Sequence, residues 1–414
     1  MRILILAHYY PPEMGGAAAR LHGLSRWLAA YGHEVTVITC FPNYPAGRID
    51  AHYRGKLCAR EQMDGVRVLR TWVYASPVKS SVRRLANYFS FVVAATWAGW
   101  LVRGQWDVVL GSSPPLFVGI AAWLIARIRR IPFVFDIRDI WPDVAVDAGE
   151  FAPDAPITRL GRGLARFLYR RADRILPVTE LKRERIAAQG VPADKLAVVT
   201  NGVDLDRVPD AVPDRRKELG LARRFVVLYA GLIGIAQGVE IAVEAAHRLA
   251  DDSRVHFLIV GDGVRRSAIE QEVSERGLTN ITMLPRQPRE AMPALLATAD
   301  VCLVPLSAAG IVDAVPSKLL EAWAHRRPVI LAAQGESAKI VQEAGGGLVV
   351  APGDGAALAE AVRRLADEPE TSGAMAEAGR AYVEARYDRC DLARQMEHVL
   401  RDVVECTHAG QATC

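Results

Sequence analysis

Short runs of Val, Ile and Leu alternate along the chain with longer segments in which apolar residues recur at helical spacing. Buried parallel strands read as continuous apolar runs, and the helices that connect them cover both faces of the sheet. The alternation therefore predicts an α/β protein built on parallel sheets. The strands expected in the first half are Ile3–Ala7, Val35–Thr39, Val66–Trp72, Asp107–Gly111, Pro132–Ile137 and Arg174–Val178.

The rhythm is interrupted around residues 200–215, where turn-forming Asn, Gly, Asp and Pro residues gather, and it then starts again. A chain of 414 residues is also too long for one ordinary hydrophobic core. Two similar domains are therefore expected, and two facing sheets would enclose a ligand cleft beyond the carboxyl ends of their strands. The strands expected in the second half are Phe225–Gly231, Val255–Val260, Ile281–Leu284, Val301–Pro305, Pro328–Ala332 and Gly347–Val350.

The charge is distributed unevenly between the two halves. Residues 1–200 hold 27 Lys and Arg against 16 Asp and Glu (+11), which leaves 24 against 31 (−7) for residues 201–414. The first half is therefore expected to meet an anionic partner, and no nucleic acid is expected as that partner.

The cysteines and the first residues bear on the cellular compartment. The six cysteines are scattered, with no CxxC pair and no clustered histidines, which predicts reduced thiols and no metal site. The first strand pattern is too short for a signal peptide, and no cleavage site follows it. These features predict a cytoplasmic protein.

A glycine pair follows the first expected strand. Gly15 and Gly16 permit close backbone approach where a helix, Leu21–Ala30, is about to begin, so an anionic or hydroxylated ligand is one interpretation and a plain glycine turn is the other. Neither GxGxxG nor GxxxxGK[ST] follows any strand. A dinucleotide oxidoreductase and a P-loop ATPase are therefore disfavoured.

Ligand-friendly loops follow four consecutive expected strands of the second half. The first is the turn Gly231–Gly238, whose glycines favour backbone hydrogen bonds to a phosphate, and the second is Gly261-Asp-Gly263. The third begins at Arg286, and the fourth runs from Asp313 to Glu321. Because parallel strands end at the same edge of a sheet, the four loops together indicate a site more strongly than any one of them does.

The fourth loop carries a phosphate-binding pattern. Pro316 favours a helix start, which places Asp313 in a loop and Glu321 in the first turns of a helix. Ser317 and Lys318, at the positive end of that helix, suit a phosphate, while Glu321 can accept hydrogen bonds from hydroxyls. A ligand with both phosphate and sugar hydroxyls would satisfy all of them.

Charged residues also crowd the end of an expected strand in the first half. The segment Phe135–Asp143 holds three acids, an arginine and a tryptophan, and Asp139 is the expected acid or orienting group. Two alternatives stay open: Asp136 and Arg138 simply pair with each other, or Asp139 caps a loop.

Two helical segments suggest contact with a membrane. Residues 85–102 form the most apolar window, which at about 18 residues is marginal against the ~20 that a span needs. The helix Pro156–Arg174 carries an arginine stripe, which is typical of a membrane-surface element, although a solvated face is the alternative. With the positive first half, the pattern favours peripheral contact with an anionic membrane through residues 79–103 and 156–174. The stripe consists of Arg159, Arg162, Arg166, Arg170 and Arg174.

Taken in order, these pieces resemble glycosyltransferase family 4, the retaining enzymes of the GT-B fold, from residue 1 to about residue 404. Three segments are similar to the branch that includes N-acetylfucosaminyltransferases of bacterial surface polysaccharides: Arg138–Pro142, Gly234–Gly238 and Val315–Leu319. The other matching pieces are Tyr10–Gly16, Pro177–Glu180, Asn201–Asp204, Gly261–Gly263 and the acid-x7-Glu stretch that runs into Pro328-Val-Ile.

The resemblance implies two Rossmann-like domains and a division of labour. Residues 1–200, with a final crossing helix at 388–404, would bind the acceptor, and residues 201–387 would bind the donor. Glu321 would hold the donor ribose, and Asp313 would take the place of the glutamate that faces the donor sugar or phosphate. The implied donor contacts are Gly15, Gly16, Gly231, Gly234, Gln237, Gly261, Arg286, Ser317, Lys318, Leu319 and Glu321, and the implied catalytic residues are Asp139, Lys318 and Asp313.

Two departures from the family pattern shift the emphasis to Lys318. Leu232 and Gln237 stand where many members have an arginine and a lysine on the diphosphate, and Asp313 replaces a glutamate. Charge on the leaving diphosphate must therefore be stabilised elsewhere, by Lys318, the helix start at Ser317, and Arg265 or Arg286.

The expected function is transfer of a sugar, an N-acetylated hexose from a UDP donor, onto a lipid-linked saccharide, with retention and with no metal or other cofactor. A nucleotide-sugar epimerase or hydrolase on the same fold is one alternative. A non-catalytic subunit that positions a partner transferase at the membrane is the other, because the usual Arg and Lys are missing.

Overall fold

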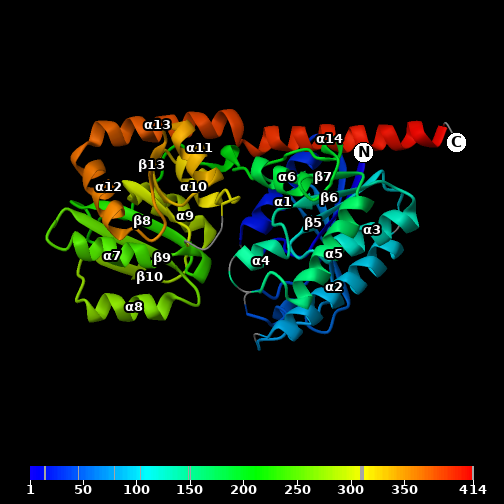
Figure 1. Cartoon of the computed structure of the whole chain (residues 1–414), viewed down its shortest axis with the longest axis horizontal. Helices are drawn as coiled ribbons and strands as arrows, with labels where there is room; N and C mark the ends of the chain where they lie inside the picture. The colour runs from blue at the N-terminus through cyan, green and yellow to red at the C-terminus, as the bar shows by residue number, and fades with distance from the viewer. Residues whose placement is uncertain are drawn as a thin grey trace. The chain divides into compact units, whose positions relative to one another are not determined.

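The computed structural model describes residues 1–13, 15–44, 46–78, 80–102, 104–147, 149, 151–307 and 312–412. The chain divides into two compact units. We call residues 1–146, 150–201 and 389–414 the N-terminal unit, and residues 147–149 and 202–388 the C-terminal unit. Figure 1 colours the chain from one end to the other and shows that each unit contains its own sheet.

The N-terminal unit is built on a seven-stranded sheet in the order β3-β4-β2-β1-β5-β6-β7. Every pairing is parallel except that of β3 with β4. Because β1 lies at the centre, the chain leaves it toward one side of the sheet and later returns to the other. The strands are β1 (Arg2–Ala7), β2 (Glu34–Cys40), β3 (Cys58–Met63), β4 (Val66–Thr71), β5 (Val108–Ser113), β6 (Phe133–Ile137) and β7 (Arg174–Pro177).

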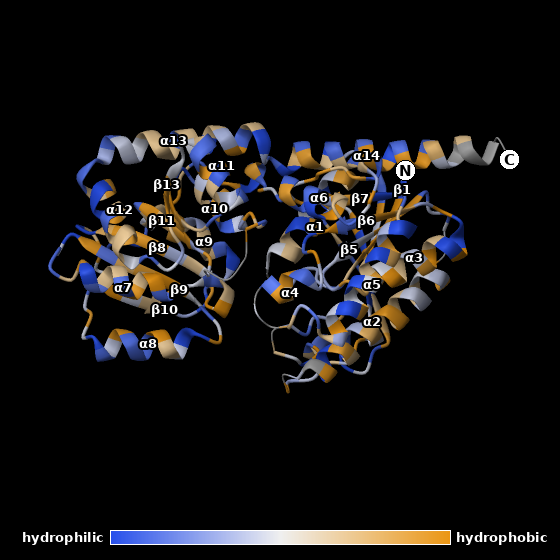
Figure 2. Cartoon of the chain, viewed as in Figure 1, coloured by the Kyte–Doolittle hydropathy of each residue, from blue (hydrophilic) through white to orange (hydrophobic). Residues whose placement is uncertain are grey.

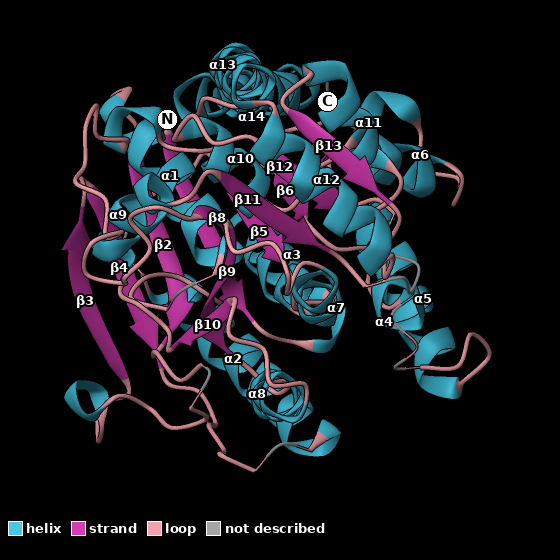
Figure 3. Ribbon diagram, turned by 90° about the vertical axis from the view of Figure 1, so that its left-hand side faces the viewer, coloured by secondary structure: helices cyan, strands magenta, loops and turns pink. Residues whose placement is uncertain are grey.

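The edge strand β3 is missing from the expectations drawn from the apolar runs. Its residues alternate between half-buried and exposed, as those of an edge strand with one solvated face do, so no continuous apolar run marks it. The signal that finds it is Asp64-Gly65, a hairpin turn in which both residues have positive φ. This antiparallel edge is visible beside β4 in Figure 3.

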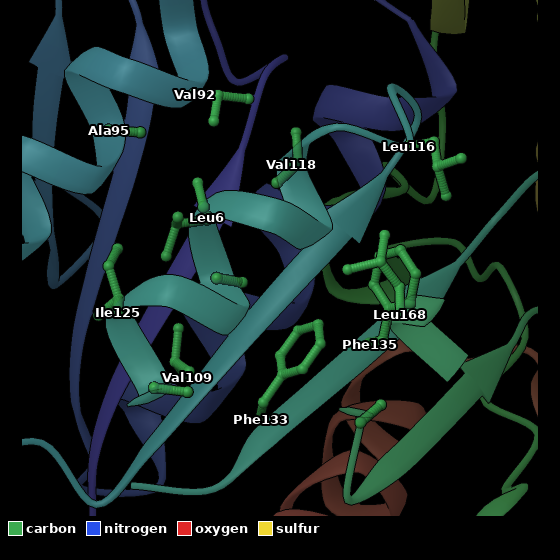
Figure 4. Packing of buried hydrophobic residues seen from close by; sticks show 14 of the residues in the cluster. Leu6, Val92, Ala95, Val109, Leu116, Val118, Ile125, Phe133, Phe135 and Leu168 are labelled. Atoms are coloured by element: carbon green, nitrogen blue, oxygen red, sulfur yellow. The ribbon is translucent and has the colours of Figure 1, made fainter. Parts of the chain in front are cut away.

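Helices cover both faces of this sheet. Helices α2, α3 and α5 bury one face in a core that includes Phe133, Phe135 and Leu168, and Figure 4 shows these side chains packed together. On the other face, Leu21 and Leu24 of α1 pack with Met396 and Leu400 of α14. The helices are α1 (Gly16–Ala30), α2 (Ser81–Leu101), α3 (Val118–Arg129), α4 (Asp143–Asp147), α5 (Pro156–Arg171), α6 (Glu180–Ala187) and α14 (Arg389–Ala412).

Helices α1 and α14 extend beyond the bounds expected for them. Helix α1 begins at Gly16, directly after Gly15, rather than at Leu21, because the small residues Ala17–Ala19 continue the helix toward the glycine pair. Helix α14 continues to Ala412, beyond the expected end at residue 404. The last helix therefore returns to the N-terminal unit and forms part of its core.

The C-terminal unit has a six-stranded, wholly parallel sheet in the order β10-β9-β8-β11-β12-β13. The strands β9, β8 and β11 are neighbours, so the loops that follow them end at one edge of the sheet. The strands are β8 (Phe225–Leu232), β9 (Val255–Asp262), β10 (Ile281–Leu284), β11 (Val301–Pro305), β12 (Val329–Ala332) and β13 (Gly347–Val350).

Apolar side chains again gather between sheet and helices, as the orange strands inside each unit of Figure 2 show. Helices α7 and α12 cover one face of this sheet, and α10 and α13 cover the other. Trp323 of α10 is fully buried, and its indole N–H donates to the carbonyl of Gly346 at 2.8 Å. The helices are α7 (Glu240–Arg248), α8 (Arg266–Glu275), α9 (Met292–Thr298), α10 (Ser317–Ala324), α11 (Glu336–Ala344), α12 (Gly355–Asp367) and α13 (Pro369–Arg386).

Candidate functional site

Two glycine turns meet at the carboxyl edge of the C-terminal sheet. Gly231, at the end of β8, is the register partner of Gly261 on β9, and a Cβ on Gly261 would stand only 1.8 Å from the Gly231 carbonyl oxygen. Gly231 and Gly261 have φ values of +145° and +157°, which side chains rarely adopt. The sequence uses glycine here because the two backbones touch. Gly261 is buried, and its carbonyl accepts from Arg266, whereas Gly231 leaves a half-buried backbone surface at the end of β8.

The side chain of Lys318 lies over this surface. A Cβ on Gly231 would be 2.5 Å from Lys318 Cε and 2.8 Å from its Nζ, so a side chain at this position would displace the end of the lysine from where it lies. The Lys318 amine donates to the Tyr229 hydroxyl at 2.6 Å and stands 4.0 Å from the centre of the Tyr229 ring. The Tyr229 hydroxyl in turn donates to the carbonyl of Leu232. Two segments that are distant in sequence, the end of β8 and the start of α10, thus fix one amine.

The surroundings of Lys318 weaken its hold on a proton. Burial of the amine lowers the pKa of Lys318 to about 7, and the nearby charge of Glu321 opposes that shift only in part. Burial also raises the pKa of Tyr229, which keeps its hydroxyl neutral. Among the described residues no carboxylate lies within ion-pair distance of Lys318. Its positive charge is therefore available to an anionic ligand, and such a ligand would favour the protonated amine.

The residues around Lys318 occupy the first turns of α10. Pro316 precedes the helix with ψ of 132°, and Ser317 is its first residue, half-buried. Glu321 lies one turn further along and is also half-buried, whereas Asp313, in the bend before the helix, is buried. The side chain of Leu319 is fully buried in the core beneath α10, so it fixes the helix while its neighbours face the edge of the sheet.

The other residues of the C-terminal unit that are expected to contact the donor differ in their exposure and partners. Gly234 and Gln237 share the turn after β8, where the Gln237 side-chain oxygen lies 2.6 Å from the position that a Cβ of Gly234 would take. Leu232 is 52% exposed, and Arg286 lies exposed in the loop after β10. Arg265 pairs with Glu240 at 2.6 Å. Among the basic residues considered for a diphosphate, the structure brings Lys318 onto the Gly231 turn.

The glycine pair of the N-terminal unit is open to solvent. Gly15 precedes α1 with φ of +144°, and no atom lies within 4 Å of the position that a Cβ would take. The backbone conformation, rather than crowding, therefore calls for glycine at this position. Gly16 is likewise exposed.

Glu13, beside that pair, is a residue that the sequence reasoning did not single out. It is buried, and its Oε1 accepts from the backbone N–H groups of Asn43 and Tyr44 at 2.8 and 2.9 Å. Burial raises its pKa, although these two hydrogen bonds oppose the shift. Glu13 thus ties the glycine loop to the loop after β2. A carboxylate next to a Pro-Pro and Gly-Gly pair was the available signal.

The charges at the end of β6 form a buried ion pair with α1. Asp136 is fully buried and accepts from Arg20 at 2.9 Å and from the Ser112 hydroxyl at 2.6 Å. Arg20 also donates to the backbone carbonyl of Val199. The alternative in which Asp136 and Arg138 simply pair with each other is therefore wrong, because the arginine that forms the ion pair with Asp136 is Arg20.

Asp139 stands beyond this pair, half-buried at the end of the strand. Burial lowers the pKa of its neighbour Arg138, and the charges of Asp139 and Asp136 oppose that shift. The Arg138 guanidinium donates to the carbonyl of Ser113 at 3.3 Å. Asp139 and Arg138 thus form a charged pair of neighbours at the edge where β5 and β6 end.

The two segments expected at a membrane expose both apolar and basic side chains. Helix α2 exposes Phe89, Val93 and Trp97, and α5 exposes Leu160 and several arginines. Lys79 and Arg103, which end the first segment, lie outside the described residues. Arg162 pairs with Asp143, and Arg174 belongs to β7 rather than to the helix. No described helix is both long enough and apolar enough to cross a bilayer.

Within the part of the chain that the structure describes, no group of three His, Cys, Asp or Glu side chains is able to hold a metal ion.

Both halves of the chain match known protein families. Residues 15–202 match the glycosyl transferase 4-like domain, and residues 212–382 match the glycosyl transferases group 1 family. The second match contains both glycine turns and helix α10.

A curated relative and two solved structures extend these matches. The glycosyl transferase WcaI of Escherichia coli (strain K12), whose name assigns it to colanic acid biosynthesis, is 31% identical over 329 residues, covering 77% of this chain and 80% of WcaI. Sucrose-phosphate synthase from Thermosynechococcus elongatus has a TM-score of 0.77 at 21% identity, covering 98% of this chain and 99% of that one. HepE from Anabaena, in complex with UDP-glucose, has a TM-score of 0.71 at 18% identity, covering 97% and 100%.

Proposed function

Since the chain belongs to the GT-B glycosyltransferases that join a glycosyl transferase 4-like domain to a group 1 domain, we propose that it builds a surface polysaccharide by transferring a sugar from a nucleotide diphosphate donor. The name of WcaI supports the polysaccharide, because that relative is similar over most of both chains. The geometry around Lys318 supports the donor.

The observation that carries the donor assignment is the Lys318 amine lying over the Gly231 turn at the end of β8. An amine next to glycine turns and the start of a helix suits a diphosphate, whose oxygens accept hydrogen bonds from the amine and from backbone N–H groups. Glu321, one helical turn away, would accept hydrogen bonds from the ribose hydroxyls. UDP is the proposed nucleotide, supported by the UDP-glucose that HepE holds on a similar fold.

The proposed mechanism is electrostatic. Negative charge grows on the diphosphate as the bond to the sugar breaks, and the Lys318 ammonium stabilises it most in that state. The anomeric configuration is retained, and no enzyme carboxylate acts as a nucleophile. Asp313 contacts the sugar side of the donor, and Asp139 orients the acceptor or takes up its proton.

The proposed acceptor is a lipid-linked saccharide, and the transferred sugar is an N-acetylated hexose. The exposed apolar and basic side chains of α2 and α5 support the lipid-linked acceptor, because together they suit the surface of an anionic membrane. The enzyme would then act at the cytoplasmic face of the membrane, in peripheral contact through residues 79–103 and 156–174.

A donor panel tests the proposal. The purified protein is incubated with UDP-, GDP- and dTDP-sugars and with glycolipids extracted from polysaccharide-producing cells, and the products are read by mass spectrometry and by NMR of the new linkage. A UDP-dependent mass increase of the glycolipid with retained configuration is expected. Epimerised or hydrolysed donor in the absence of acceptor, with no change in the glycolipid, would contradict the proposal.

A further inference from the structure

A pocket in the N-terminal unit lies among α2, the segment that follows β5, and the start of α5. Among the described residues that line it, Arg84 carries the only charged side chain, and the rest of the lining is apolar or aromatic. The walls that matter here are Leu85, Tyr88, Phe117, Trp141 and Ile157.

The walls offer few hydrogen bonds. Pro114 and Pro115 line one side, and a proline has no backbone N–H to donate. The Tyr88 hydroxyl interacts with the Tyr9 side chain, and burial together with this interaction raises the pKa of Tyr9. A saccharide buried here would leave hydroxyl groups without partners, which is costly, whereas a hydrocarbon would not. The pocket therefore favours an apolar ligand.

The pocket adjoins the edge of the sheet where the glycine pair lies. The Tyr88 ring packs edge-on against His8, which directly follows β1, with centroids 5.3 Å apart. Burial lowers the pKa of His8 to about 4, so this neighbour adds no charge at neutral pH. Pro114 follows β5, and Trp141 comes after the charged end of β6. An apolar ligand here would lie beside the strand ends of the N-terminal unit.

Helix α2 extends the apolar surface away from the pocket and also supplies a charge. Phe89, Val93 and Trp97 lie at spacings of four on this helix, and their side chains are 48%, 71% and 60% exposed. Arg84 lies at the helix start, is exposed, and forms no ion pair with a described residue. Apolar walls with one available cation match an amphiphile whose hydrocarbon is joined to an anionic phosphate.

We propose that this pocket binds the hydrocarbon nearest the phosphate of a lipid-linked acceptor, with Arg84 on that phosphate. The proposal rests on the proposed function, because it names the lipid part of the acceptor that the transferase would use. The rest of the hydrocarbon would continue along the exposed face of α2 toward the bilayer.

Farnesyl diphosphate is the probe for the pocket. Its binding to the full chain is measured by calorimetry in saturating UDP, so that the donor site is occupied, and is compared with that of inorganic diphosphate and of farnesol. Farnesyl diphosphate should bind at least about tenfold more tightly than either, because it alone has both the hydrocarbon and the charge.

Two pairs of variants locate the binding. Ile157→Trp fills the pocket, whereas Leu160→Trp adds the same ring on the exposed face of the same helix. Arg84→Gln removes the lining charge, whereas Arg83→Gln removes the exposed charge next to it. The first member of each pair should weaken binding about tenfold and the second less than about twofold. Thermal melting of each variant checks that the fold is intact.

Three results would overturn the proposal. Equal effects of the paired variants would place farnesyl diphosphate elsewhere. An Ile157→Trp variant that loses binding to anionic phospholipid vesicles as strongly as it loses farnesyl diphosphate would make the pocket a membrane-lipid site. A wild-type protein that fails to bind UDP would contradict the proposed function, and this proposal with it. Retained UDP binding without preference for the isoprenoid tail would contradict the pocket alone.

Discussion

The two units use a cation near their strand ends in opposite ways: one cation is buried and the other is half-buried. In the N-terminal unit, Arg20 is fully buried and neutralised by Asp136, which also accepts from Ser112. In the C-terminal unit, the Lys318 amine has a neutral partner, the Tyr229 hydroxyl, and lies over a glycine turn. Both cations stand near the ends of parallel strands.

We propose that the difference separates a structural charge, that of Arg20, from a binding charge, that of Lys318. A buried ion pair satisfies both of its members, so breaking it leaves an uncompensated charge and costs stability. The Lys318 amine has a hydroxyl as its hydrogen-bond partner, so no carboxylate of the described residues neutralises it and its charge can interact with a ligand. Its lowered pKa shows that burial makes the charged form less favourable. Fold alone therefore does not tell which cation at a strand end serves the chemistry, whereas its partner does.

Removing Arg20 should produce the largest loss of stability. Arg20→Met leaves the Asp136 carboxylate buried with Ser112 as its remaining partner, so unfolding of the N-terminal unit should become easier by about 3–5 kcal/mol. Urea unfolding followed by circular dichroism measures this. Arg67→Met, which breaks an exposed ion pair with Glu34, is the control and should cost about 0–1 kcal/mol. Equal losses would show that the buried pair is not structural.

Removing Lys318 should produce the largest loss of activity. Lys318→Ala takes away the charge that stabilises the leaving diphosphate, so kcat/KM for the donor should fall by roughly 100- to 1000-fold while the melting temperature changes little. Steady-state kinetics with the donor found in the panel measures this. Lys339→Ala, on the surface of the same unit, should leave kcat/KM unchanged. Near-normal turnover of Lys318→Ala would contradict the assignment of Lys318 to the donor diphosphate.

The pH dependence of donor binding should sharpen the assignment. The protonated amine attracts the diphosphate, and burial puts the pKa of Lys318 in the free enzyme at about 7. Affinity for a UDP-sugar should therefore be full below pH 7 and fall by up to about tenfold per pH unit above it. Calorimetry with UDP-N-acetylglucosamine between pH 6 and 9 measures this. Lys318→Arg keeps its charge over that range, so a matching decline in this variant would assign the pH dependence to another group.

The smallest expected effect comes from the partner of the lysine. Tyr229→Phe removes the hydroxyl that accepts from Lys318 but keeps the ring beneath the amine, so donor affinity should fall only about 2- to 10-fold. Donor titration with UDP-N-acetylglucosamine measures it. Tyr382→Phe, which removes a surface hydroxyl bonded to Glu343, provides the comparison. A loss as large as that of Lys318→Ala would mean that Tyr229 itself contacts the donor.

Local patterns in the sequence were enough to predict most of the fold. The strand Ile281–Leu284 was predicted with its observed bounds, because a short apolar run between turns identifies a buried strand. The proline before Ser317 located the start of α10 for a similarly local reason. The strand β3 was missed because an edge strand with one solvated face carries no such run.

In the candidate site, too, local sequence patterns predicted some features and missed others. The sequence by itself determined that Gly231, Gly261 and Lys318 follow parallel strands, since each belongs to a local pattern of strand, turn and helix. Only the tertiary structure decided the partners: Tyr229 meets Lys318 across 89 positions, and Arg20 meets Asp136 across 116. Such contacts depend on the order of strands and on side-chain packing between distant segments, and neither leaves a periodic trace in the sequence.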